Sequence, residues 1–306
     1  MRMISRSGAL LPRRTHTMDE LDFSGTKHPT LRAAPQPAPQ PQRALYNPAL
    51  ALEFFKGGGK LEEVAGGKQF FAENDKAGGL FSKDRMYLLL EGEIGLMAKG
   101  SFVGLIRPGE IFGEMAVLAR APRTASAMAK TACKALSLDE KSFTAALAKT
   151  PEFALMMMAV MVNRLRQTIA RQASGATAPG AVTDRQAVFN KKELAALALE
   201  IAPLRADAGK VIMNTGDTGV FMYIVEEGRV AISIQSKVVE RIGPGGVFGE
   251  MALVDNASRA ATATAEADST LILVKRADFL GLVRMKPEFG ASVLRTIAER
   301  MQVLRD

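Results

Sequence analysis

The chain contains one cysteine, two histidines and no tryptophan among its 306 residues. A lone Cys133 cannot form a disulfide within the chain, and it cannot supply the several thiolates of a metal cluster. We expect it to be a buried structural residue of a strand. Both histidines, His16 and His28, precede residue 45. The remainder of the chain therefore has no histidine for a metal site or for acid–base catalysis, and we expect neither a metal nor an enzyme.

Long hydrophobic runs and concentrated positive charge are also lacking. The longest apolar run, Phe153 to Val162, is shorter than the roughly 20 residues that cross a bilayer. No membrane partner is therefore expected, and the predicted location is the cytoplasm. The net charge of +8 divides into +4 over residues 1–44, +4 over 45–172 and 0 over 173–306. Because this excess does not gather on one helix, it does not favour a specific nucleic-acid partner.

What the chain does contain is a sixteen-residue segment that occurs twice. Residues 112–127 read FGEMAVLARAPRTASA and residues 248–263 read FGEMALVDNASRAATA, with matching positions 136 residues apart and no gap. The similarity continues, because Pro151-Glu152-Phe153 is matched by Pro287-Glu288-Phe289 at the same offset. A duplication in a chain of this length predicts two domains of similar fold.

Three residues of each copy have the chemistry to hold a phosphate attached to a sugar. In the first copy, Gly113 lets the backbone approach a ligand, and the helical turn after it would aim free N–H groups at an anion. Glu114 can accept a hydrogen bond from a sugar hydroxyl. Arg123 offers a planar fork of donors that matches two phosphate oxygens. The second copy carries the same three residue types as Gly249, Glu250 and Arg259.

A surface turn with an exposed glutamate and arginine is the simplest alternative for one copy alone. Two copies in equal register make that alternative less favourable. The small side chains of Ala116, Ala121 and Ala125 would also leave room for a ligand.

The two segments resemble the phosphate-binding cassette of cyclic nucleotide-binding domains. That family includes the catabolite activator protein, the regulatory subunit of cAMP-dependent protein kinase and cyclic nucleotide-gated channels. The resemblance implies that the glutamate holds the ribose 2'-hydroxyl and the arginine holds the cyclic phosphate. The second copy departs once, since Ser258 stands where Pro122 would have fixed φ. The resemblance implies cAMP as ligand, with cGMP as an alternative and no cofactor, at Gly113, Glu114, Met115, Ala116, Arg123, Thr124, Ala125, Gly249, Glu250, Met251, Ala252, Arg259, Ala260 and Ala261.

Short runs of strand-forming residues separated by turns favour small antiparallel barrels. The expected fold class is mainly β with flanking helices: two tandem double-stranded β-helix (jelly-roll) barrels, each followed by C-terminal helices. The expected domains are a disordered basic, proline-rich tail over 1–44, domain A over 45–172, a linker over 173–183 and domain B over 184–306. The expected strands are Lys68 to Ala72, Met86 to Leu90, Glu93 to Ala98, Phe102 to Ile106, Ser126 to Ala129, Lys134 to Leu138, Lys210 to Met213, Phe221 to Val225, Val230 to Ile234 and Val238 to Ile242.

The segment Pro151 to Ala170 predicts a helix rich in methionine. Its expected inward stripe consists of Phe153, Met157, Val160, Leu165 and Thr168. The alternative is that this helix closes over a nucleotide base or pairs with a second subunit. No aromatic residue follows Phe153 or Phe289 within the two C-terminal helices, so no residue is assigned to cap the base.

The sequence contains no kinase glycine loop, Walker motif or nucleophile elbow, and no helix-turn-helix module is expected after the second domain. The expected function is a cyclic nucleotide receptor that regulates an unidentified protein effector through ligand-induced movement of the C-terminal helices. A homodimer is an open alternative for its assembly. The alternative function is a scaffold or oligomerising protein whose pockets do not bind nucleotide, and a weak nucleic-acid binder that uses the basic tail is a third.

The residue after each cassette arginine predicts a difference in base selectivity. Thr124 follows Arg123, whereas Ala260 follows Arg259, and a hydroxyl at this position can hydrogen-bond the exocyclic amine of guanine where an alanine cannot. We expect cAMP at the second site and cAMP with some cGMP at the first. Equal ratios of cAMP to cGMP affinity at the two sites, measured by titration, would contradict this prediction.

Overall fold

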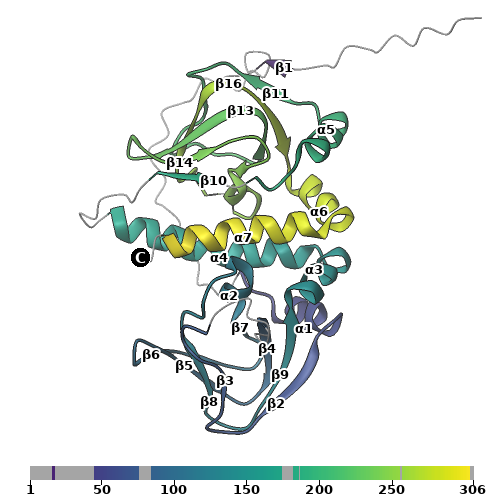
Figure 1. Cartoon of the computed structure of the whole chain (residues 1–306), viewed down its shortest axis with the longest axis vertical. Coiled ribbons are helices and arrows are strands. Elements are labelled where there is room, and N and C mark those ends of the chain that lie inside the picture. The colour runs from purple at the N-terminus through teal and green to yellow at the C-terminus, as the bar shows by residue number, and fades with distance from the viewer. Residues whose placement is uncertain are drawn as a thin grey trace, which may run out of the picture.

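The computed structural model describes residues 16–17, 45–75, 84–173, 182–185, 187–255 and 257–303. Two β-rich lobes lie at opposite ends, and the long helices α4 and α7 lie between them (Figure 1). In chain order the elements are β1 (His16–Thr17), α1 (Pro48–Lys56), β2 (Lys60–Val64), β3 (Gln69–Phe71), β4 (Arg85–Glu91), β5 (Ile94–Ala98), β6 (Ser101–Ile106), β7 (Ile111–Phe112), α2 (Glu114–Ala119), β8 (Ser126–Ala129), β9 (Cys133–Asp139), α3 (Glu140–Lys149), α4 (Glu152–Ala173), β10 (Thr183–Arg185), α5 (Lys191–Glu200), β11 (Leu204–Ala206), β12 (Val211–Met213), β13 (Met222–Ile234), β14 (Lys237–Ile242), β15 (Val247–Phe248), the 3-10 helix η2 (Glu250–Leu253), β16 (Thr262–Val274), α6 (Arg276–Met285) and α7 (Pro287–Val303).

The first lobe is built from two antiparallel four-stranded sheets, in the orders β2-β9-β4-β7 and β3-β8-β5-β6. Alternate residues of these strands point inward and form a core that includes Tyr87, Ile94, Phe112 and Cys133. The burial of Cys133 in β9 agrees with its expected structural role. β2 and β7 were not among the expected strands; β7 is only two residues long, and β2 reads KLEEV with little apolar character.

The second lobe repeats this architecture with longer strands. Its sheet follows the order β1-β11-β16-β13-β14-β10, with β12 on β16 and β15 on β13. The expected strands at 221–225 and 230–234 are one bulged strand, β13, which bends around Gly228 at φ 89°. In the first lobe Gly92, at φ 92°, separates β4 from β5, and an added Cβ there would lie 2.5 Å from the Ala132 carbonyl oxygen. A glycine at this bend is thus required in both lobes.

Side-chain caps define where the helices before and after the barrels begin. Asn47 caps α1 by accepting from the amides of Ala49 and Leu50. Asn190 begins α5 with a capping box, in which Glu193 returns a hydrogen bond to the Asn190 amide. The two caps show that the repeat includes the helix that precedes each barrel.

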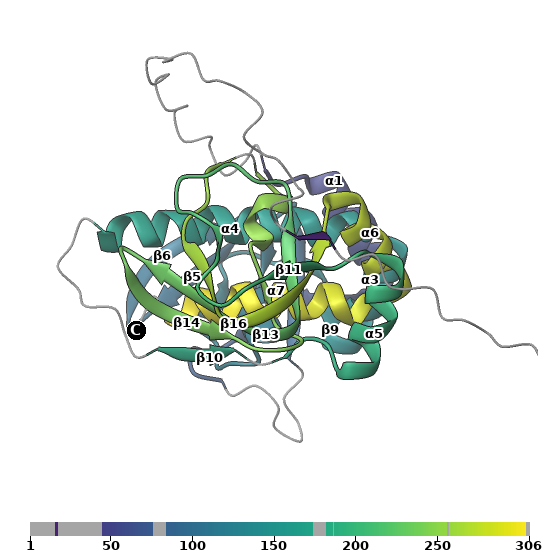
Figure 2. The same cartoon turned by 90° about the horizontal axis from the view of Figure 1, so that it is seen from above.

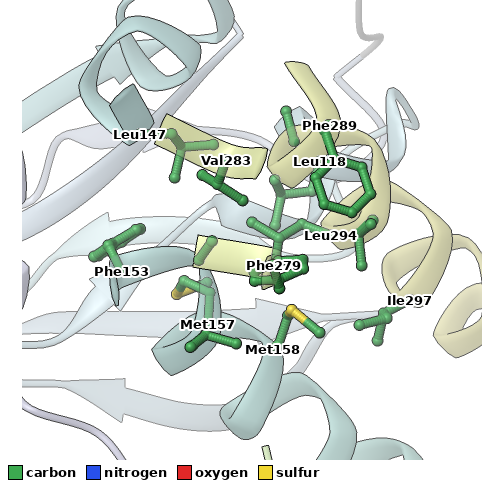
Figure 3. Packing of buried hydrophobic residues seen from close by; sticks show 14 of the residues in the cluster. Leu118, Leu147, Phe153, Met157, Met158, Phe279, Val283, Phe289, Leu294 and Ile297 are labelled. Atoms are coloured by element: carbon green, nitrogen blue, oxygen red, sulfur yellow. The ribbon is translucent and has the colours of Figure 1, made fainter. Parts of the chain in front are cut away.

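The helices α4 and α7 pack against each other, and each also contacts the cassette of the other lobe. α7 touches α2 and α3 of the first lobe, while α4 touches η2 of the second. Figure 2 looks down on the second lobe, with both helices beneath its strands. One hydrophobic cluster spans both lobes and contains Leu118 of α2, Met158 of α4 and Leu294 of α7 (Figure 3). The two lobes therefore share a core at their junction.

Phe153, Met157 and Leu165 of the expected inward stripe of α4 are buried, but the buried surface of this helix is wider than the stripe. Residues 153–158 are all buried, whereas Val160 of the expected stripe is only half-buried. A helix that is covered on several sides loses the one-sided pattern of a surface helix. α4 is covered because α7 and both lobes pack around it. The side chain of Thr168 lies outside the described residues.

Two segments that the sequence analysis assigned to a tail and a linker contain short strands. His16–Thr17 pairs in parallel with β11, so the expected lack of structure in the tail is wrong at these two residues. β10, which includes Thr183 of the expected linker, pairs in parallel with β14. Both occupy edges of the second lobe, where unpaired backbone groups accept a further strand.

Among the described residues, no single helix is long and apolar enough to cross a bilayer. α3 and residues 152–167 of α4 reach that length and composition only together, across a bend of 116°.

The shared core predicts that a cavity in α7 destabilises the whole molecule. Leu294 is fully buried at the junction, so Leu294→Ala should lower the free energy of unfolding by about 2–5 kcal/mol. Leu199→Ala on α5, where the side chain is 77% exposed, serves as control and should change it by less than about 0.5 kcal/mol. Chemical denaturation should show a single transition for both variants. Two transitions, with only one shifted by Leu294→Ala, would contradict a shared core.

Candidate functional site

Each cassette begins with a glycine in the left-handed region. Gly113 has φ 73° and Gly249 has φ 72°, values that favour glycine over other residues. An added Cβ would lie 2.8 Å from Arg123 Nη1 in the first lobe and 3.0 Å from Arg259 Nη1 in the second. The glycines are thus required both for the turn and for the close approach of the arginine. The expected helical turn follows as α2 in the first lobe and as the shorter η2 in the second.

In the first lobe, Arg123 ties the cassette to the barrel without a ligand. Its Nη1 donates to the Gly113 oxygen at 2.7 Å, and its Nη2 donates to the Arg85 oxygen at 2.8 Å. Only 5% of Arg123 is exposed, and burial lowers its pKa although Tyr87 and nearby carboxylates oppose the shift. Phe71 covers one face of the guanidinium, with its ring centroid 4.1 Å from Cζ. The backbone bonds use two of the five donors, so others remain for an anion.

Arg259 makes the same backbone bonds in the second lobe. Its Nη1 donates to the Gly249 oxygen at 3.0 Å, its Nη2 donates to the Phe221 oxygen at 2.9 Å, and 6% of the residue is exposed. The ring of Tyr223 is more distant, at 5.8 Å from Cζ. Met213 pairs with Ala263 as Phe71 pairs with Ala127, so a methionine occupies the position of Phe71 in this lobe. Arg259 is therefore as buried as Arg123, but no aromatic ring lies as close to its guanidinium as Phe71 lies to that of Arg123.

The second cassette lines a cavity of about 360 Å³, within the range of about 300–1,000 Å³ typical of small-ligand sites. All seven expected residues of this lobe contribute to it: Gly249, Glu250, Met251, Ala252, Arg259, Ala260 and Ala261. The barrel adds Met213, Ile232, Ile234, Val239, Glu240 and Phe248. In the first lobe, the corresponding residues lie in α2 and in the segment that follows it. Met115, Ala116 and Arg123 are buried, Glu114 and Ala125 are half-buried, and Thr124 is exposed.

The cassette glutamates bind arginines on the C-terminal helices, and the sequence analysis missed these partners. Glu250 is fully buried and pairs with Arg300 of α7, which also binds Glu240 at 3.2 Å. Burial alone would lower the pKa of Arg300, but the two carboxylates raise it above its usual value. Glu250 Oε2 is buried and has no hydrogen-bond partner within the part of the chain that the structure describes. An unpaired buried acceptor is suited to a ligand hydroxyl.

The first lobe has the same pairing in a more open form. Glu114 binds Arg164 of α4 at 3.2 Å, and the Arg164 side chain is 41% exposed. Arg164 and Arg300 are 136 residues apart, the offset of the repeat. This register was the signal that could have identified both arginines. Arg120 of the first cassette binds Glu140 at 2.6 Å, and 60% of its side chain is exposed.

The cavity of the second lobe also has walls from outside its own barrel. α4 of the first lobe contributes Leu165 and Arg166, β10 contributes Asp184, and α7 contributes Thr296, Glu299 and Arg300. No pattern in the sequence indicated that the first lobe would reach the second site. Of the described residues, none form a group of three or more histidine, cysteine, aspartate or glutamate side chains that could hold a metal ion.

Comparison with known proteins identifies the family. The chain matches the cyclic nucleotide-binding domain twice, over residues 63–150 and 203–286, which is more than half of its length. The chain belongs to the cyclic nucleotide-binding domain family. Its two copies confirm the tandem arrangement and, with the sheets described above, the expected fold class.

Several curated relatives share part of the sequence. The cyclic AMP receptor protein of Thermus thermophilus is 34% identical over 99 residues, which are 31% of this chain and 46% of the relative. A cyclic nucleotide-gated potassium channel of Rhizobium etli is 35% identical over 116 residues, 37% of this chain and 32% of the channel. A cAMP-dependent protein kinase regulatory subunit of Eremothecium gossypii is 38% identical over 95 residues, 30% of this chain and 21% of the subunit. The chain thus spans less than half the length of these relatives.

Similar solved structures include cAMP-bound PfPKA-R, which is 21% identical with a TM-score of 0.33 and coverage of 86% of this chain and 90% of that one. The catabolite activator protein of Thermus thermophilus is 28% identical with a TM-score of 0.33, covering 37% and 56% of the two chains.

The two glutamate–arginine pairs predict unequal effects on stability. Arg300→Ala should lower the free energy of unfolding by about 3–5 kcal/mol, because it leaves the fully buried Glu250 without its cationic partner. Arg164→Ala is the matched variant in the first lobe and should cost less, about 1 kcal/mol, since 41% of the Arg164 side chain is exposed to solvent. Denaturant titration of the full chain measures both values. Equal losses would show that burial does not distinguish the pairs.

Proposed function

We propose that the chain is a cytoplasmic receptor for a cyclic nucleotide, with cAMP as the ligand, and that it acts by regulating another protein. The observation that carries the proposal is the cavity of the second lobe, where a buried arginine and a buried glutamate face the same space. Arg259 would hold the cyclic phosphate through its remaining donors. Glu250 Oε2 would accept a hydrogen bond from the ribose 2'-hydroxyl.

The same assignment is proposed for the first lobe. Arg123 would hold the phosphate and Glu114 the ribose, within the matching cassette residues. Phe71 lies against Arg123 and would have to accept the ligand beside it or move. The names of the Thermus and Eremothecium relatives, a cyclic AMP receptor protein and a cAMP-dependent kinase subunit, support cAMP over cGMP.

Ligand binding would act on the C-terminal helices through the cassette glutamates. Glu250 binds Arg300 of α7, and Glu114 binds Arg164 of α4. A ribose hydroxyl that binds the same carboxylates would change how strongly these arginines are held. Because such a ligand interacts differently with two helix positions, it shifts their populations. The displaced helices would expose or cover a surface for the effector protein.

The alternative is a scaffold whose pockets do not bind nucleotide. One observation favours this alternative. Arg123 and Arg259 each donate hydrogen bonds to two backbone oxygens, and these bonds stabilise the fold whether or not a ligand binds. A structural role alone could therefore maintain both arginines. Titration with cAMP and cGMP separates the two functions.

Calorimetric titration of the full chain should give two cAMP sites. Arg123→Ala and Arg259→Ala should each weaken their own site by about 2–5 kcal/mol, or about 30-fold to several thousandfold in the dissociation constant. Glu114→Ala and Glu250→Ala should weaken binding less, because water can partly replace the carboxylate at a ribose hydroxyl. Circular dichroism of each variant controls for folding.

If both arginine variants bind within about threefold of the parent, the phosphate does not lie at these arginines and the receptor function fails. A stoichiometry of one cAMP per chain would show that one of the two pockets, either that of the first lobe with Phe71 or that of the second lobe with Ser258, does not bind cAMP.

A further inference from the structure

Arg166 of α4, in the first lobe, binds Asp255 and Ser258 in the phosphate-binding loop that precedes Arg259 in the second lobe. On the Asp255 carboxylate, Nε donates to Oδ2 at 2.9 Å and Nη2 donates to Oδ1 at 3.1 Å. Nη1 donates to the Ser258 carbonyl oxygen at 2.9 Å. Side-chain exposure is 23% for Arg166 and 27% for Asp255, so the pair is partly shielded from water. Bidentate pairing of this kind fixes geometry as well as adding energy.

The loop that Arg166 binds lacks the proline found in the first cassette. Residue 258 immediately precedes Arg259, and the first cassette has Pro122 at this position. Proline restricts φ covalently, whereas serine leaves it free. In the described part of the chain, the Ser258 amide donates no hydrogen bond that could take over this role. The Arg166 contact with the Ser258 oxygen thus lies at the position where the two cassettes differ.

We propose that Arg166 is a positioning residue of the second site, which holds Asp255 and Ser258 so that Arg259 faces the cavity. This inference rests on the proposed nucleotide binding and adds that the affinity of the second site depends on the first lobe. Arg166 replaces, from another lobe, the restraint that Pro122 supplies within the first cassette.

The helix that carries Arg166 also reaches the first site. Arg164 binds Glu114, and two residues later Arg166 binds Asp255. At 3.6 residues per turn, positions two apart face nearly opposite sides of a helix, so α4 presents one arginine to each lobe. Ligand binding that rearranges Glu114 and Arg164 would therefore act on the helix that holds the second loop. By linkage, occupancy of the second site would change the affinity of the first by the same factor.

Among the described residues, α7 makes no matching arginine contact with the loop before Arg123, although it packs against α2. Gln302 of α7 stands at the repeat position of Arg166, and in the described residues its side chain makes no hydrogen bond to the first cassette. Arg295 of α7 instead binds Glu140 of α3 at 2.8 Å. Glu140 in turn holds the exposed Arg120. The direct arginine contact with a phosphate-binding loop thus runs from the first lobe to the second.

The test uses the full chain with Arg123→Ala in every arm, so that cAMP titration reports the second site. Adding Arg166→Ala should weaken cAMP binding about tenfold to hundredfold, the loss expected for a bidentate charged hydrogen-bonding contact. Arg295→Ala is the matched control, because it removes another ion pair between the lobes without touching the second cassette. It should stay within about threefold of the parent. Unchanged affinity in Arg166→Ala, or an equal loss in Arg295→Ala, would overturn the proposal.

A rescue variant separates positioning of the loop from direct contact with the ligand. Ser258→Pro introduces the residue of the first cassette and should restore most of the affinity lost in Arg166→Ala. Among the described residues the substitution removes no backbone hydrogen bond, and alanine precedes the position in both cassettes. A loss that Ser258→Pro leaves unchanged would assign Arg166 to ligand contact and refute its role on the loop.

Hydrogen exchange without nucleotide tests the same contact independently of binding. Arg166→Ala should speed exchange of peptides containing Asp255 to Ala260 by about tenfold or more if opening of the loop becomes easier by a comparable factor. Ser258→Pro should reverse this change. If the parent binds neither cAMP nor cGMP, the proposed function fails while this measurement still decides on the loop. Unchanged exchange in Arg166→Ala would overturn the positioning role.

Discussion

The packing of α4 against α7 is the constraint on which the rest of the structure depends. Each helix ends its own lobe and lies against the cassette of the other, so neither lobe completes its apolar surface alone. Burial of this surface supplies the main driving force for joining the lobes. The same packing brings Arg164 toward one cassette and Arg166 toward the other. The geometry of the second cavity is therefore a consequence of how the helices pack.

The side chains proposed for ligand recognition also stabilise the fold. Arg123 and Arg259 bond the cassette to the barrel through backbone oxygens, and their remaining donors are those proposed for a phosphate. Glu250 is buried with one oxygen paired and the other unpaired. Leaving a buried acceptor unsatisfied costs stability, and a ligand hydroxyl would remove that cost. The second site thus has a physical reason to bind a polar ligand.

The two lobes have diverged around a common plan. Phe71 stacks on the arginine of the first lobe, whereas Met213 lines the cavity of the second. Pro122 restrains the first loop from within, while Arg166 contacts the second loop from outside. The glutamate partner is half exposed at Arg164 and mostly buried at Arg300. These differences give the lobes unequal surroundings for the same three cassette residues.

Much of this organisation could be predicted from the chain alone. Local patterns located most strands, the helix α4 and the tandem jelly-roll class, because strand alternation, helix caps and turn residues act over a few positions. The duplication placed Gly113, Glu114 and Arg123 in register with their second copies, and their role in binding stays a prediction. Very short or charged strands such as β7 and β2 carried too little apolar signal to be recognised.

By itself the sequence determined two barrels of one family and the residues at the centre of each cassette, since spacing along the chain is enough for both. Only the tertiary structure decided which arginines face the glutamates, that α4 is buried on several sides, and that Arg166 reaches the loop before Arg259. The last contact joins residues 92 positions apart. Such contacts depend on the packing of whole helices, which no local pattern records.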